Sequence, residues 1–267
     1  MAVTTHVHDA LDRVDAEQEH VAGELSALDR FEAGVRELDP VSPAESTGAS
    51  HAVGDAAPVA GAFRPNAARP DRLDRVRDLF AETVRPYSLA DVEGSEPLVE
   101  TIRTELGEEI ATAIAPATPG RFTADLQRAI LSSVDQRTAE LRAMDRALAR
   151  EAESLATALE TFEATIDWLV DADETPLSEL GFESLRERHE TLADHRTRVE
   201  ELMRERQDSL HRTTTYDAAA GLVHRSLAGY LYGELPTTHP VLSTAVRLDS
   251  VCEECQRAVR DHLTRRA

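Results

Sequence analysis

Two cysteines stand three residues apart late in the chain, in Cys252-Glu-Glu-Cys255. Residues three apart share one face of a helix, and His262 continues that face. Because zinc prefers thiolate and imidazole ligands, Cys252, Cys255 and His262 form a candidate metal site, with His239 or His224 as a fourth ligand. The interpretation we favour is that both cysteines pack in the core as small apolar residues, since no β-strand pattern supports a redox pair. We therefore expect no cofactor, and zinc is the alternative.

A second spacing with metal-binding precedent is Glu17-Gln-Glu-His20. Di-iron helical bundles use two E-x-x-H motifs and two further inward glutamates, and this sequence has no second E-x-x-H. His189 and His195 lie six residues apart and do not share a helical face, so we expect both on the solvated surface. The sequence also lacks a phosphate-binding glycine loop, a nucleophile elbow and a zinc-protease motif. These observations predict a protein without enzymatic activity.

Heptad spacing predicts the longest of the helices that would position these residues. Large apolar residues recur every seven positions over five repeats, which predicts a helix at 122–170 that buries one stripe against partner helices. Trp168 near its end is expected in the core, and an anchor for a partner is the alternative. The first apolar set is Val134, Leu141, Leu148, Leu155, Phe162 and Leu169, and the second set is Met144, Ala152, Leu159 and Ile166.

The whole pattern predicts an all-α fold, namely an elongated antiparallel helical bundle or coiled coil with a small C-terminal helical head. Residues 39–69 are rich in Ala, Pro, Gly and Ser, so we expect a disordered linker there. The predicted divisions are an N-terminal coiled-coil helix at 1–38, the linker at 39–69, and a helical bundle at 70–267 that contains a long hairpin at 122–212 and the head at 213–267.

Caps and prolines set the expected ends of the individual helices. Asp71 is the predicted N-cap of a short helix that Pro86 stops, and one continuous helix is expected at 96–115. Thr123 is the predicted cap of the long helix. Pro176 is expected to be the first helical residue of the second hairpin helix.

The charge is the strongest compositional signal. Asp and Glu number 50 against 29 basic residues, the net charge is -21, and every basic residue is Arg because no Lys occurs. Acidic surfaces hold water and ions, and salt at 1 M shortens the Debye length to about 3 Å. We therefore infer a halophilic cytosol. An acidic protein that mimics nucleic acid is the alternative, and it is disfavoured because the charge is spread along the chain.

The same features limit the expected cellular location of the protein and the kinds of partner that it can bind. Residues 1–11 have no apolar core and no apolar run approaches about 18 residues, so we expect a cytoplasmic protein without a membrane segment. The negative charge opposes nucleic-acid binding, and the arginines at 257, 260, 265 and 266 are interpreted as favourable charge at a helix C-terminus. We expect a protein partner or self-association through helical faces.

A resemblance adds to this interpretation. The run Tyr230-Leu-Tyr-Gly-Glu-Leu-Pro is followed by His239-Pro-Val-Leu and by Arg247-Leu, and Phe122-Thr and Glu151-Ala-Glu-Ser-Leu occur earlier. These segments resemble a haloarchaeal family of uncharacterised coiled-coil proteins, a domain of unknown function, in which Tyr is commoner than His at position 239. The resemblance implies the fold and an archaeal source, and it implies no activity.

Taken together, the sequence predicts a non-catalytic structural or protein-interaction coiled-coil protein adapted to high salt. The alternative is a regulatory module that senses metal or redox state through Cys252 and Cys255.

Overall fold

The computed structural model describes residues 5–41, 71–88, 96–116, 120–216 and 224–266. These residues form helices and no strand, which confirms the predicted all-α class. From residue 42 onward the predicted linker lies outside the described residues. The chain divides into two compact units, Glu19–Asp145 and Met1–Gln18 with Arg146–Ala267. Within the described ranges, no helix combines the length and the apolar character needed to cross a membrane.

The unit Glu19–Asp145 contains parts of α1 (His6–Arg36) and α6 (Ala124–Asp173). Between them in sequence lie α2 (Arg72–Thr83), the 3-10 helix η2 (Arg85–Tyr87), α4 (Leu98–Leu106) and α5 (Glu108–Ala113). Its core includes an edge-to-face contact between Phe31 and Phe80, whose ring centroids lie 5.6 Å apart. Both rings are fully buried, so this aromatic pair fixes α2 against α1.

Side-chain caps determine where α1 ends and where α6 begins. The side-chain Nε2 of Gln127 donates to the carbonyls of Val35 at 2.9 Å and Leu38 at 3.0 Å. The Val35 carbonyl also accepts from the Leu38 N–H at 3.3 Å, so a backbone turn and a side chain from α6 together close the end of α1. Thr123 Oγ1 accepts from the Leu126 N–H at 3.2 Å, which confirms the predicted N-cap of the long helix.

The single helix expected at 96–115 is wrong, because the chain forms α4 and α5 with Gly107 between them. Gly107 has a φ of 96°, a conformation that ends a right-handed helix and suits glycine. The Leu106 carbonyl freed at this break accepts from Ser133 Oγ at 2.8 Å. The predicted cap of α2 is confirmed, since Asp71 Oδ1 accepts from the Leu73 N–H at 3.4 Å.

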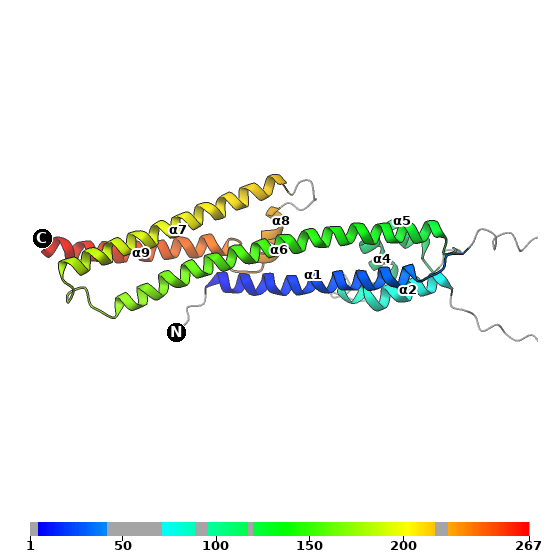
Figure 1. The fold of residues 1–267 in the computed structure, drawn as a ribbon, viewed down its shortest axis with the longest axis horizontal. Coiled ribbons are helices and arrows are strands. Elements are labelled where there is room, and N and C mark those ends of the chain that lie inside the picture. The colour runs from blue at the N-terminus through cyan, green and yellow to red at the C-terminus, as the bar shows by residue number, and fades with distance from the viewer. Residues whose placement is uncertain (1–4, 42–70, 89–95, 117–119, 217–223, 267) are drawn as a thin grey trace, which may run out of the picture. The chain divides into compact units, whose positions relative to one another are not determined.

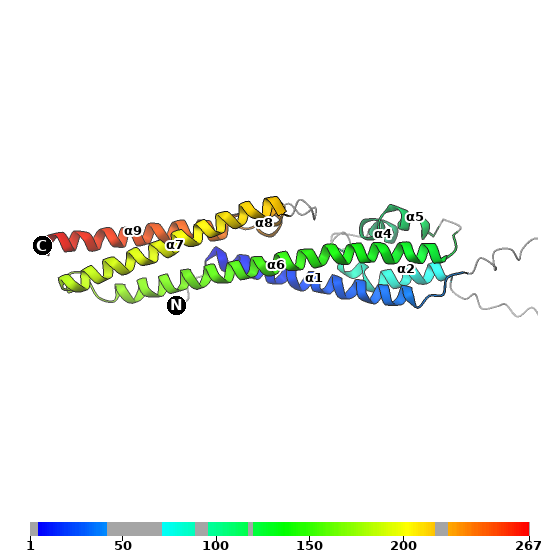
Figure 2. The same cartoon turned by 45° about the horizontal axis from the view of Figure 1, so that its top comes forward.

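The second unit is organised around the hairpin of α6 and α7 (Phe182–Tyr216). Glu151 of α6 bonds Arg206 of α7, and Thr165 bonds His195, so the two helices run antiparallel as predicted. α8 (His224–Tyr232) and α9 (Pro240–Arg266) follow, and α9 lies beside α7 in both views (Figures 1 and 2). At 1.5 Å per residue, the 50 residues of α6 extend about 75 Å.

The start of α7 differs from the prediction at Pro176. Residues 174–181 form a turn, closed by the Glu179 N–H donating to the Pro176 carbonyl at 3.0 Å, and α7 begins at Phe182. Arg188 also donates to the Thr175 carbonyl at 3.2 Å and so fixes the turn against α7. These two hydrogen bonds hold the turn, and Leu177 within it is partly buried along an apolar groove.

α9 is held along α7 by polar contacts as well as by its apolar residues. Arg196 Nε of α7 donates to Asp249 Oδ1 of α9 at 2.8 Å, and its Nη1 donates to Gln256 Oε1 at 3.2 Å. Gln256 donates in turn to the His189 carbonyl at 3.3 Å. The sequence places 213–267 in a small head, and these contacts show that α9 packs along the hairpin helix.

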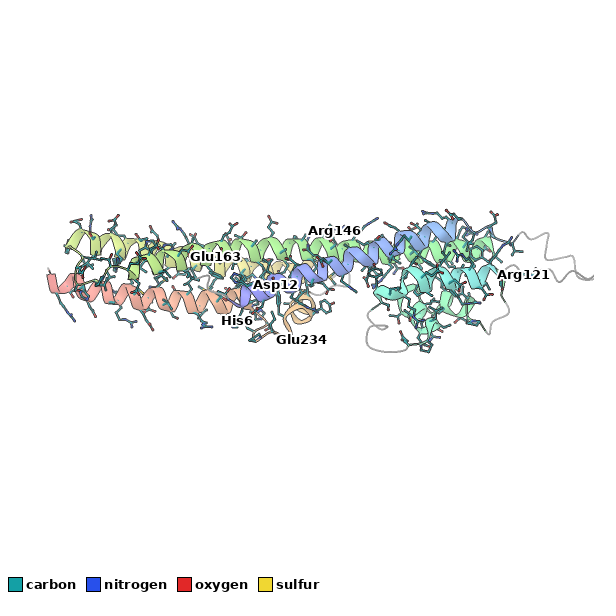
Figure 3. All side chains as sticks on the ribbon, turned by 90° about the horizontal axis from the view of Figure 1, so that it is seen from below. His6, Asp12, Arg121, Arg146, Glu163 and Glu234 are labelled. Atoms are coloured by element: carbon teal, nitrogen blue, oxygen red, sulfur yellow. The ribbon has the colours of Figure 1, made fainter. Side chains whose placement is uncertain are left out.

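Charged side chains stand away from the helices (Figure 3). The labelled Asp12, Arg146, Glu163 and Glu234 are all exposed. These acidic side chains therefore lie on the solvent side of the helices.

Candidate functional site

The buried face of α6 contains polar residues that the heptad pattern did not predict. The second buried set lies one position earlier than expected, at Glu151, Ala158 and Thr165. Two of these three residues are polar, and they are buried because α7 supplies hydrogen-bonding partners for them. The first predicted set is confirmed as buried at Val134, Leu141, Leu148, Leu155 and Phe162, but its last member, Leu169, is only partly buried.

Glu151 is the centre of a buried network between α6, α7 and α8. Arg206 donates two hydrogen bonds to its carboxylate, Nη2 to Oε1 at 2.6 Å and Nη1 to Oε2 at 2.8 Å. Arg206 Nη1 also lies 3.1 Å from Ser154 Oγ, and the Tyr232 hydroxyl donates to Glu151 Oε1 at 2.5 Å. The side chains of Glu151 and Arg206 are each 5% exposed, and Tyr232 is fully buried.

The charge of Glu151 keeps both partners protonated. Burial alone would lower the pKa of Arg206, but the hydrogen bond and charge of Glu151 outweigh it, and this pKa is raised. Burial raises the pKa of Tyr232, and the nearby carboxylate raises it further. Since cation, anion and phenol are mutually bonded in the core, the network orients three helices and is unsuited to proton transfer.

A second polar layer surrounds His195 of α7. Thr165 Oγ1 donates to the Thr161 carbonyl at 2.9 Å and lies within hydrogen-bonding distance, 3.1 Å, of His195 Nδ1. The Trp168 ring covers the imidazole at 5.2 Å between centroids. Burial lowers the pKa of His195, and the charge of Arg198 adds to this effect. The expected surface position is wrong for His195, which is 6% exposed.

The E-x-x-H residues of α1 have separate partners. Glu17 is buried and accepts from the Tyr230 hydroxyl at 2.7 Å, which fixes α8 to α1. His20 Nε2 lies 3.6 Å from Glu24 Oε1. The two side chains thus serve different contacts.

The two cysteines of the candidate metal site differ in their surroundings. Cys252 is fully buried, as a core residue would be, and Cys255 is partly exposed. Burial raises the pKa of Cys252 to about 11 and also raises that of Cys255, so both thiols favour the protonated form that does not bind metal. Among the described residues, no three His, Cys, Asp or Glu side chains lie close enough to hold a metal ion. The structure therefore does not bring His262 together with Cys252 and Cys255 as a set of metal ligands. The zinc alternative stays a prediction.

An apolar groove lies between α6 and α9. Two adjoining cavities of about 560 and 400 Å³ share Ile166, Leu248 and Val251 as lining residues, and we refer to them together as the α6–α9 groove. Val251 is 47% exposed and Val170, also in the lining, is 58% exposed. Two large apolar side chains in this groove are thus left open to solvent.

Sequence reasoning missed both Arg206 and the groove, although each has a periodic signal. Arg206 follows Val199 by seven residues, in step with Leu185 and Leu192, so it occupies a core position of α7. The groove corresponds to a second stripe on α9 with alternating steps of four and three. That stripe is Thr244, Leu248, Val251, Cys255, Ala258 and His262.

A family model described as Domain of unknown function (DUF7260) matches residues 5–256. The chain belongs to this family. No curated protein and no solved structure matches the chain.

The structure gives the motif residues of this DUF7260 chain physical roles. Glu151 and Ser154 from one segment, and Tyr232 from the other, meet around Arg206. Two of the segments that suggested the family therefore come together in space at the buried network.

Proposed function

We propose that this DUF7260 protein is a non-catalytic structural or interaction protein that binds a helical chain in the α6–α9 groove. The observation that carries the proposal is the half-exposed Val251, which lies with Ile166 and Leu248 in an apolar groove. Exposed apolar patches rimmed by polar residues are typical of sites for protein contact. The absence of catalytic motifs in the sequence supports the non-catalytic part of the proposal.

The proposed setting is the cytoplasm of a haloarchaeal cell with molar salt. The net charge of -21 and the absence of Lys support this setting. Because the Debye length is about 3 Å at 1 M salt, contacts between exposed charges are weak there, whereas burial of apolar area keeps its strength. A partner bound through an apolar groove suits such a solvent.

Site-specific photocrosslinking tests the proposal. Without Lys the chain offers amine-reactive reagents no side chain, so a photoreactive amino acid is placed at Val170 in the groove or at Val246 as the control. Val246 is similarly exposed, at 56%, but does not line the groove. We expect a discrete adduct, with this chain or with another protein, from Val170 and none from Val246 in a halophilic host.

Two results would contradict the proposal. One is the absence of any adduct from Val170 at native salt. The other is stoichiometric zinc in the purified protein that Cys252→Ala removes, which would move the function to the C-x-x-C and its metal-sensing alternative.

A further inference from the structure

We infer that the occupant of the α6–α9 groove is a second copy of this chain, docked antiparallel through α9. The inference rests on the proposed function and names the partner for the same site. Three observations on α9 carry it: a second apolar seam, small residues within that seam, and charges that complement themselves under two-fold symmetry.

α9 carries two apolar seams, and its neighbours cover one of them fully and the other only in part. Val241, Ala245, Cys252 and Val259 are fully or almost fully buried. The second seam, which we call the open seam, alternates in steps of four and three and consists of Thr244, Leu248, Val251, Cys255 and Ala258. Leu248 is buried within the chain, whereas Val251 and Ala258 are exposed and the other two are partly exposed. The alternating steps are the spacing of a helix that packs against another helix, so α9 is built to contact helices on two sides.

The open seam has a shape that admits a helix. Leu248 and Val251 stand at its centre, while Cys255 and Ala258 are small, so an incoming backbone can approach closely. Ile166 and Val170 of α6 form the opposite wall and would cover the incoming helix from the other side.

The charges beside the open seam select a second copy. Arg247 and Glu254 are both exposed, stand one heptad apart, and form no ion pair with any other described residue. In an antiparallel pair with Val251 against Leu248 of the partner subunit, Arg247 lies beside Glu254 of the partner subunit. Two-fold symmetry makes the same contact twice, so each exposed charge gains an opposite one.

The mass of the full chain in solution tests this inference. In about 2 M KCl, where charge repulsion is screened, light scattering should give twice the 29.3 kDa of one chain. Val251→Glu places a carboxylate in the centre of the contact and should raise the dimer dissociation constant at least about 100-fold. Val246→Glu is the matched control on the same helix and should leave the dimer intact.

Charge reversal tests the antiparallel register separately. Arg247→Glu or Glu254→Arg alone should weaken the dimer by about tenfold in low salt, because each creates two like-charge contacts. The double variant Arg247→Glu, Glu254→Arg should restore wild-type affinity. Failure of the double variant to recover would overturn the proposed register.

Further outcomes decide the inference itself. A wild-type monomer at all salt concentrations would overturn it, and so would equal dissociation of the Val246 and Val251 variants. If Val251→Glu lowers the helicity measured by circular dichroism, Ala258→Glu replaces it as the variant that disrupts the dimer. Cys255 lies in the same contact, so it should react with maleimide faster in the Ala258→Glu variant than in the wild-type protein. If the photoreactive residue at Val170 forms adducts only with other proteins, the second copy is excluded and the proposed function stands. If it forms no adduct, both the inference and the proposed function are contradicted.

Discussion

The Glu151–Arg206 pair places opposite charges where water cannot solvate either one. Both carboxylate oxygens accept from the guanidinium, and the Tyr232 hydroxyl adds a third bond. A buried ion pair adds little net stability over an apolar pair, because desolvation offsets the attraction. Its stronger effect appears when one partner is removed and the other charge stays buried.

We predict that Arg206→Ala lowers the free energy of unfolding by about 3–5 kcal/mol, since Glu151 is left without its cation. Urea denaturation at high KCl measures this change. Arg204→Ala, on an exposed face of the same helix, is the control and should change stability by less than about 0.5 kcal/mol. The combined variant Glu151→Leu, Arg206→Leu, Tyr232→Phe should stay within about 1 kcal/mol of wild type, and a large loss there would show that the ions themselves are stabilising.

We predict that His195 makes the protein less stable as the pH falls. Its pKa is lowered in the fold, chiefly by burial, so the unfolded chain binds a proton near pH 6.5 while the folded chain does not. The contribution is therefore present above about pH 6.5 and is lost as the pH falls through the folded pKa. His195→Gln should reduce the fall in unfolding free energy between about pH 7.5 and 5.5. An imidazole NMR signal from His195 that titrates at or above its ordinary value would contradict this account.

At the scale of elements, glycines on α1 permit close packing of other segments. A Cβ built at Gly23 would lie 2.5 Å from Cε1 of Tyr87 in η2. Gly34 likewise faces Leu79 of α2, at 2.9 Å from its Cδ atoms. α1 therefore gives up helix propensity at these positions so that the helices of its unit can approach.

We predict that Gly23→Ala destabilises the protein by about 1–3 kcal/mol, although alanine raises helix propensity by about 1 kcal/mol. Gly229→Ala in α8 is the control, because nothing lies within 4 Å of its Cβ, and it should stabilise by up to about 1 kcal/mol. Thermal unfolding followed by circular dichroism measures both. A cost of Gly23→Ala that persists unchanged in a Tyr87→Ala background would locate the clash elsewhere.

At the scale of the whole molecule, the net charge of -21 makes stability depend on salt. Repulsion among exposed carboxylates opposes the compact state, and salt screens it. We predict that the midpoint of thermal unfolding rises between about 0.1 and 2 M KCl, most steeply below about 0.5 M. A variant with the exposed Glu153, Glu160 and Asp167 changed to amides should show a smaller rise. A midpoint that does not respond to KCl would contradict the proposed halophilic setting.

The sequence by itself determined the elements with strong periodic or capping signals. The first heptad set of α6, the Thr123 and Asp71 caps and the antiparallel hairpin all follow from local chemistry, in which a few nearby residues decide the outcome. The acidic, lysine-free composition is likewise known from the sequence alone. By contrast, the break at Gly107 and the turn after Pro176 go with hydrogen bonds to other helices, from Ser133 of α6 to the Leu106 carbonyl and from Arg188 of α7 to the Thr175 carbonyl.

Only the tertiary structure decided which polar residues are buried and which apolar residues are exposed. Glu151 and Thr165 read as solvent positions until Arg206 and His195 of α7 are placed opposite them. Val251 had no assigned role in the sequence, and its exposure in a groove is seen only once α9 is placed beside its neighbours. Periodicity reports which residues share a face of a helix, but the face that meets a neighbour is fixed by partners tens of residues away in the chain.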